Sequence, residues 1–144
     1  MELPLWFIAN FATAFLVCGF AMWRGGGPER VAGLFLLVSN VLTFIMPDRR
    51  WNDVQFGIMW LDIVAFALFV ALALLADRWW TMWLAGFQGL CVLLHLAFWA
   101  QMKITSLVYS TGLNLIGYAV FVTLLLGTIA HVRRQKAAVP AVFE

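Results

Sequence analysis

The feature that most limits the fold of this chain is a series of apolar segments separated by short polar ones. They cover residues 4–23, 31–46, 56–76, 79–102 and 106–131. Four of the five reach the roughly 20 residues that a helix needs to cross a bilayer. The second would span about 24 Å as a helix, so it crosses only with snorkelling flanks or local thinning of the bilayer. Helices are predicted for all five, because backbone exposed to lipid must satisfy its own hydrogen bonds.

Composition supports the same interpretation. The chain is 65% hydrophobic and 11% charged, whereas a soluble domain is about half apolar and about a quarter charged. We therefore expect an all-α polytopic membrane protein, with residues 1–144 forming a single five-helix transmembrane bundle and residues 132–144 its cytoplasmic tail. The net charge is only +2, and the sequence lacks the Lys- and Arg-rich run that would indicate a nucleic-acid partner. The expected partners are membrane lipids.

The first apolar segment and the basic residues predict an orientation. The N-terminus carries Glu2 and lacks the positive n-region of a signal peptide, so we expect it to be a retained membrane helix. With the N-terminus outside and the C-terminus inside, six basic residues lie on the cytoplasmic side and three lie outside, as the positive-inside rule favours. The inner six are Arg24, Arg30, Arg78, Arg133, Arg134 and Lys136, and the outer three are Arg49, Arg50 and Lys103.

Strongly polar residues share one depth across the five predicted helices. Counted from the expected outer ends at about 1.5 Å per residue, each lies about 9–12 Å below the outer boundary. They are Asn10, Asn40, Asp62, His95 and Asn114. Gln88 and Trp99 follow helical spacing with His95, so one face of the fourth helix would carry all three. These seven residues are the candidate ligand- or proton-binding set.

Asp62 and His95 form the ionisable pair of this layer. An aspartate at a bilayer centre costs roughly 2.5–3.5 kcal/mol on insertion scales, so such a residue usually has a partner. Three interpretations stay open for the pair: a hydrogen bond that only locks two helices together, a ligand or ion site, or a proton relay. The asparagines are equally open to a purely structural role.

Signatures of catalysis and metal binding are absent from the sequence. No HExxH, GxSxG or P-loop motif occurs, and Cys18 and Cys91 do not form a CxxC pair. His95 and His131 would lie roughly 20 Å or more apart along the bundle, which excludes a shared haem or metal within one molecule. We expect no catalytic residue, no metal and no cofactor.

Five spans and eight tryptophans in 144 residues resemble, in composition, the tryptophan-rich sensory protein (translocator protein) family, whose members bind porphyrins and sterols. The Trp- and Pro-rich segments after that family's first helix have no counterpart here, where Trp23 is followed by RGGGPER. No site residue therefore carries over. The chain also resembles the short multi-pass proteins of bacterial membranes, which implies a bacterial-type cytoplasmic (inner) membrane location and no activity.

Two functions are consistent with these patterns. The first is a non-enzymatic membrane protein with an outward-facing polar cavity that binds or passes a small polar ligand or a proton. The second is a non-catalytic subunit of a larger membrane complex, or a homo-oligomer, in which the polar layer only holds helices together.

Overall fold

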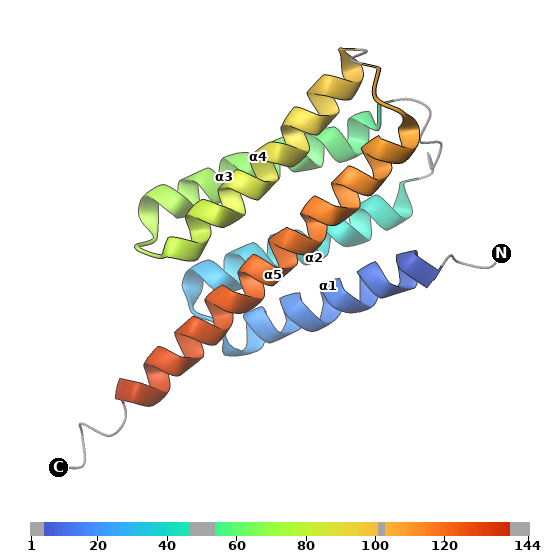
Figure 1. Cartoon of the computed structure of the whole chain (residues 1–144). Coiled ribbons are helices and arrows are strands. Elements are labelled where there is room, and N and C mark those ends of the chain that lie inside the picture. The colour runs from blue at the N-terminus through green and yellow to red at the C-terminus, as the bar shows by residue number, and fades with distance from the viewer. Residues whose placement is uncertain (1–4, 47–53, 101–102, 139–144) are drawn as a thin grey trace.

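In the computed structural model, residues 5–46, 54–100 and 103–138 are described, and within these ranges the secondary-structure elements are all α-helices, joined by short non-helical segments. The helices are α1 (Leu5–Arg24), α2 (Gly27–Ile45), α3 (Phe56–Leu75), α4 (Trp79–Trp99) and α5 (Ser106–Ala138). Figure 1 shows α3 and α4 as one antiparallel pair, α1 and α2 as a second, and the long α5 running across both. The predicted all-helical class is confirmed.

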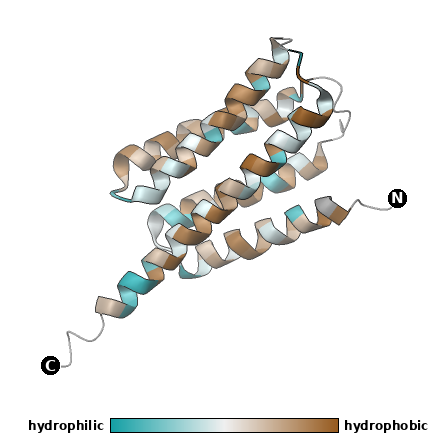
Figure 2. Cartoon of the chain, viewed as in Figure 1, coloured by the Kyte–Doolittle hydropathy of each residue, from teal (hydrophilic) through white to brown (hydrophobic). Residues whose placement is uncertain are grey.

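Four of these helices, α2 to α5, are long and apolar enough to cross a membrane, and the apolar part found for α1 is the shorter stretch Ile8–Arg24. Large apolar side chains cover the outside of the bundle. Leu75, for example, is 85% exposed and Leu74 is 81% exposed. Figure 2 shows mainly brown and white helices with isolated teal positions, and more teal towards the C-terminal end of α5. An apolar surface of this extent is typical of a protein surrounded by lipid.

The second helix begins earlier than the sequence predicted. We expected it near Val31, after a GlyGlyGlyPro turn, whereas α2 begins at Gly27 with Pro28 in its first turn. Proline is favoured there because the first helical N–H groups have no intrahelical partner and the fixed φ of proline suits a helix. The extra turn gives α2 19 residues, or about 28 Å, so the expected shortfall in length is absent.

The last helix extends beyond its predicted end at residue 131. Instead of ending near His131, α5 continues through the basic residues to Ala138. Arg, Gln, Lys and Ala have high helix propensity, and polar side chains can continue a helix once it leaves the bundle. At 33 residues the helix is about 50 Å long, against the ~30 Å of a hydrocarbon core.

The core is built on close approach between helices. On α1, Ala14, Cys18 and Ala21 are fully buried, and a Cβ on Gly33 of α2 would lie only 3.2 Å from the Ala21 methyl group. Small residues at this spacing let two helix backbones pack tightly, as is common in membranes. Larger core residues, among them Phe69, Trp80, Leu84 and Leu124, fill the space between the other helices.

Candidate functional site

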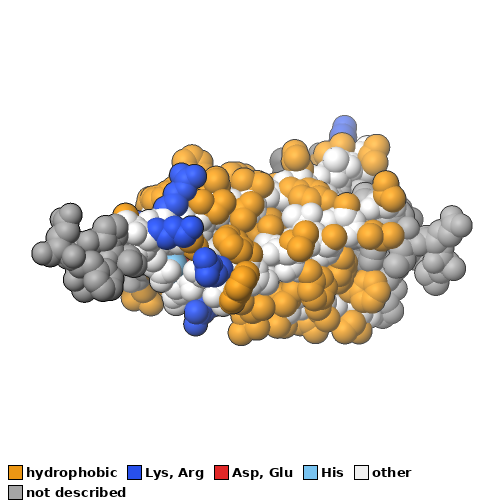
Figure 3. All heavy atoms as spheres, turned by 90° about the horizontal axis from the view of Figure 1, so that it is seen from below, with side chains coloured by type: hydrophobic (Ala, Val, Ile, Leu, Met, Phe, Trp, Pro, Cys, Tyr) orange, Lys and Arg blue, Asp and Glu red, His pale blue; other side chains and the backbone are white. Residues whose placement is uncertain are grey.

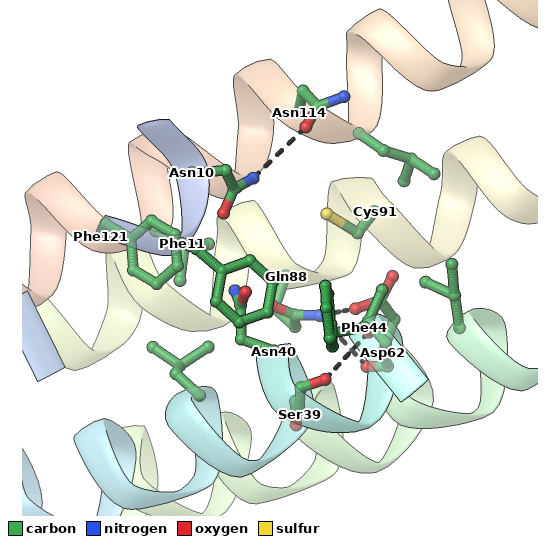
Figure 4. Close-up of a pocket in the computed structure, with 16 residues that line it drawn as sticks. Asn10, Phe11, Ser39, Asn40, Phe44, Asp62, Gln88, Cys91, Asn114 and Phe121 are labelled. Carbon is green, nitrogen blue, oxygen red and sulfur yellow. Dashed lines mark hydrogen bonds between the residues drawn. The ribbon is translucent and has the colours of Figure 1, made fainter. Parts of the chain in front are cut away.

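A cavity of about 200 Å³ lies between the two helix pairs, and all five helices contribute to its wall. Polar side chains gather here, in a bundle that is otherwise mainly apolar. They are Asn10, Ser39, Asn40, Thr43, Asp62, Gln88 and Asn114. In Figure 4, hydrogen bonds join Asn10 to Asn114 and Gln88 to Asp62. The rings of Phe11 and Phe44, which lie 5.1 Å apart, line the same cavity.

Asp62 is held by two side chains of the neighbouring helix. Its Oδ1 accepts a hydrogen bond of 2.7 Å from Gln88 Nε2, and its Oδ2 lies 2.9 Å from His95 Nε2. Gln88 and His95 are buried, and the Asp62 side chain keeps 21% of its surface exposed. A separation of seven positions along the sequence places Gln88 and His95 on one face of α4, so a single carboxylate on α3 meets both. The carboxylate is therefore fixed in direction, with its uncovered side at the cavity.

Tyr109 adds a further hydrogen-bonded side chain on the far side of His95. Its hydroxyl lies 2.6 Å from His95 Nδ1 and 3.5 Å from the backbone nitrogen of Gln55, whose N–H donates to it. A Tyr109 hydroxyl that accepts from Gln55 can donate to Nδ1, which leaves the proton of a neutral imidazole on Nε2, pointing at Asp62. Every hydrogen bond is then satisfied with an ionised carboxylate and a neutral ring. Phe98 stacks on Tyr109 at 4.2 Å and fixes the ring plane.

The asparagine pair closes the opposite wall. Asn10 Nδ2 donates to Asn114 Oδ1 at 3.4 Å, and Asn114 Nδ2 donates to the Ser110 carbonyl oxygen one turn earlier. Two buried oxygens of this region, Asn10 Oδ1 and Ser39 Oγ, have no hydrogen-bond partner in the described part of the chain. Buried polar atoms without partners are costly, by roughly 1–3 kcal/mol from mutational data, so they mark places where a further polar group fits.

The structure brings six of the seven predicted residues together. Five line the cavity, namely Asn10, Asn40, Asp62, Gln88 and Asn114, and His95 lies directly behind Asp62. Trp99 is not among them, since its indole is 62% exposed at the end of α4. It shares a face with Gln88 and Cys91, but these precede it by two to three turns, about 12–16 Å. Spacing placed Trp99 on the correct face but at the wrong depth.

Sequence reasoning missed Tyr109 and Ser39. Tyr109 lies in the first turn of α5, about 5 Å from the expected outer end, so it falls outside the 9–12 Å layer and depth counting does not find it. Ser39 precedes Asn40 on α2 and looks like any serine in an apolar run. Only the partnerless Oγ in the folded protein distinguishes it.

The polar atoms around the cavity are suited to binding a proton, a cation or a small molecule that forms hydrogen bonds. In residues 5–46, 54–100 and 103–138, no group of three or more His, Cys, Asp and Glu side chains is placed to hold a metal ion. No protein family, curated protein or solved structure matches the chain. Functional inference therefore rests on the geometry of the cavity.

Proposed function

We propose that this chain is an integral protein of a bacterial-type cytoplasmic membrane whose polar cavity binds or passes a small polar ligand or a proton. In this proposal α1 is a fifth span, the N-terminus is outside and the C-terminus inside. The distribution of basic side chains supports that orientation: in Figure 3 most of the visible Lys and Arg side chains gather towards one end of an otherwise orange surface. Arg49 and Arg50, which would oppose it, lie outside the described residues.

The observation that carries the proposal is the position of Asp62. Its carboxylate is held by Gln88 and His95 and still borders a cavity of about 200 Å³. An aspartate that served only to join helices would gain most from complete enclosure, because the bond is strongest where water is excluded. Holding the charge at the wall of a cavity instead favours interaction with a bound species.

If the species that passes is a proton, a row of hydrogen-bonded side chains provides its route. Asp62, His95 and Tyr109 are joined at 2.9 and 2.6 Å, and the chain ends at the Gln55 backbone just before α3. In the proposed orientation this end lies towards the outer face. Because Tyr109 donates to Nδ1 and the Nε2–H points at Asp62, a proton would move from the Tyr109 end through the imidazole to the carboxylate at the cavity, and the Tyr109 hydroxyl would regain a proton from the outer side.

Access to the cavity can be tested with the two cysteines of the chain. Cys91 lines the cavity and Cys18 lies in the core between α1 and α2, and both are free thiols. In the Cys18→Ala variant, the small neutral reagent methyl methanethiosulfonate should label Cys91, because the cavity admits it. In Cys91→Ala, the remaining Cys18 should react at least about ten times more slowly, as intact-mass spectrometry would measure. Equal rates, or no labelling of Cys91, would refute a ligand-accessible cavity.

A second candidate function, self-association, is favoured by a different surface. Small residues of α3 and α4, among them Ala67, Ala71 and Gly86, are exposed, and an apolar groove runs past Gly86 and Gly89. Small-residue faces let membrane helices approach closely, so a second copy of the chain is the proposed occupant. Light scattering in mild detergent should give a dimer or larger oligomer that Gly86→Leu dissociates. A monomeric wild-type protein would exclude this candidate.

A further inference from the structure

We propose that the ligand of the central cavity is a small organic ammonium ion. This inference rests on the ligand-binding function proposed above and narrows it to one chemical class. Three independent features of the wall support it: the hydrogen-bonding groups left open, the sign of the charge, and the volume.

Two buried oxygens of the wall, Asn10 Oδ1 and Ser39 Oγ, are left without partners among the described residues. Gln88 directs its amide N–H groups at Asp62, and Asn10 and Asn114 each use one amide hydrogen, on Asn114 Oδ1 and on the Ser110 carbonyl oxygen. A ligand that donates several hydrogen bonds satisfies both oxygens. A carboxylate or phosphate could accept from the Ser39 hydroxyl but would face Asn10 Oδ1 with its own oxygens. An ammonium group carries up to three such donors.

The charge of the wall has the matching sign. Among the described residues that line the cavity, Asp62 is the one carboxylate, and none is Lys, Arg or His. In the tautomer that accepts from Tyr109 at Nδ1 and donates to Asp62 from Nε2, the His95 ring adds no positive charge behind the carboxylate. A cation in a site of low dielectric gains more from one carboxylate than it would in water. The rings of Phe11, Phe44 and Phe121 also line the cavity and present faces that attract cations.

The volume limits the size of this cation. A cavity of about 200 Å³ is somewhat larger than the ~150 Å³ cavity that accepts benzene. The cation is therefore of about five to eight non-hydrogen atoms, as butylammonium or benzylammonium is. The aromatic part of the wall gives its carbon atoms apolar contact, which a bare or hydrated metal ion would not use.

Thermal unfolding of the purified full chain in detergent tests this class directly. Butylammonium chloride, sodium butyrate, butanol and sodium chloride at equal concentration and matched ionic strength form the probe series. Because a ligand that binds only the folded state raises the Tm, butylammonium should raise it by at least about 3 °C. The other three compounds should leave the Tm unchanged within about 1 °C.

Two variants and a matched control locate the effect. Asp62→Asn should abolish the butylammonium shift by removing the charge. Gly117→Leu should abolish it by filling the cavity, since Gly117 lines the wall and its Cβ position has no neighbour within 4 Å. Gly19→Leu is the control: its Cβ position is equally open, but Gly19 does not line the cavity. It should keep the full shift, and Gly117→Leu keeps the test valid if Asp62→Asn fails to fold.

The outcomes separate this inference from the function on which it rests. An equal shift with butanol, butyrate or sodium chloride would overturn the ammonium class in favour of a neutral, anionic or inorganic ligand. A lack of any butylammonium shift, with Cys91 still labelled by the neutral reagent, would overturn this inference and leave an accessible cavity. Failure of both the shift and the labelling would remove the binding function as well.

Discussion

Two acids at opposite ends of the bundle, Asp62 and Glu29, differ in almost every respect. Asp62 lies between the helix pairs with two hydrogen-bond partners and a cavity beside it. Glu29, in the first turn of α2, is 0% exposed, and neither of its carboxylate oxygens has a hydrogen-bond partner among the described residues. In the proposed orientation, the Asp62 end of the bundle is the outer region and the Glu29 end is the inner region. The outer acid, Asp62, is therefore positioned by polar contacts, whereas the inner acid, Glu29, is enclosed by packing alone.

Glycine residues make this close packing around Glu29 possible. A Cβ on Gly26 would lie 2.8 Å from His131 Cε1 and 3.0 Å from Glu29 Oε2, so only glycine leaves room for both. One layer further into the bundle, a Cβ on Gly127 would lie 2.5 Å from the buried Trp80 ring. The arrangement of the outer region therefore depends on hydrogen bonds, and that of the inner region depends on the steric fit of its side chains. Substitutions should affect the two regions in different ways.

The largest effect is expected at the outer acid. Asp62→Asn replaces a charged acceptor by an amide that directs N–H groups at Gln88 Nε2 or His95 Nε2. Because hydrogen bonds to a buried charge are lost, unfolding in mixed micelles should show a loss of about 2–3 kcal/mol. The isosteric control Asn114→Asp, on the opposite wall, would show whether any change of charge in the cavity has this effect. A loss below about 0.5 kcal/mol for Asp62→Asn would mean that its contacts do not hold the bundle.

The next effect should come from packing at the inner region. Gly127→Ala forces the Trp80 ring to move, and overpacking of this kind costs about 1–3 kcal/mol. Gly19→Ala is the matched control, because its Cβ would meet nothing within 4 Å. It should leave stability unchanged or raise it slightly through helix propensity. If the same unfolding assay gave the two variants equal stability, this would contradict the conclusion that steric fit stabilises the inner region.

A smaller effect is predicted for Tyr109. Tyr109→Phe removes the hydroxyl 2.6 Å from His95 Nδ1 while keeping the ring that stacks on Phe98. The cost should be about 1 kcal/mol, the usual net value of one hydrogen bond. Nitrogen NMR of the labelled imidazole should also show a changed balance of its two tautomers, since the donor that fixed it is gone. An unchanged spectrum would exclude the Tyr109–His95 contact.

The smallest effect should come from the inner acid. Glu29→Gln removes a carboxylate that makes no hydrogen bond in the described ranges, so the loss of stability should be below about 0.5 kcal/mol, or stability should rise. The same unfolding measurement, run beside Asp62→Asn, gives the contrast directly. If Glu29→Gln lowered the free energy of unfolding more than Asp62→Asn, Glu29 would have to bind a partner from outside the described residues.

Sequence patterns were sufficient to predict the helices and insufficient to predict their ends. Apolar runs place the centre of each helix, because lipid leaves the backbone no alternative. The beginning of α2 depends on Pro28 and two glycines, residues that indicate a turn and a helix start equally well. The end of α5 depends on polar residues whose helix propensity is unrelated to the membrane.

Part of the site was predictable for a similar reason. Depth along a helix follows from counting, and it correctly brought Asp62 and His95 to one level. Trp99 was included only for its helical spacing with Gln88 and His95, although it ends α4 and lies two to three turns beyond Gln88 and Cys91. Glu29 received no attention in the sequence, where an acid beside Pro28 and Arg30 resembles an exposed helix start. Its burial is a property of the packed bundle.

The position of α5 also has a consequence for biosynthesis. Figure 1 shows α5 crossing both helix pairs, and it supplies Asn114, Gly117 and Phe121 to the cavity and Tyr109 to the chain behind Asp62. As the ribosome produces the chain, the α1–α2 and α3–α4 hairpins are complete while Asp62 and Asn10 still lack this wall. Of the five helices, α5 is translated last, and it completes the wall of the cavity. A chain truncated before residue 106 would carry the two hairpins without this cavity.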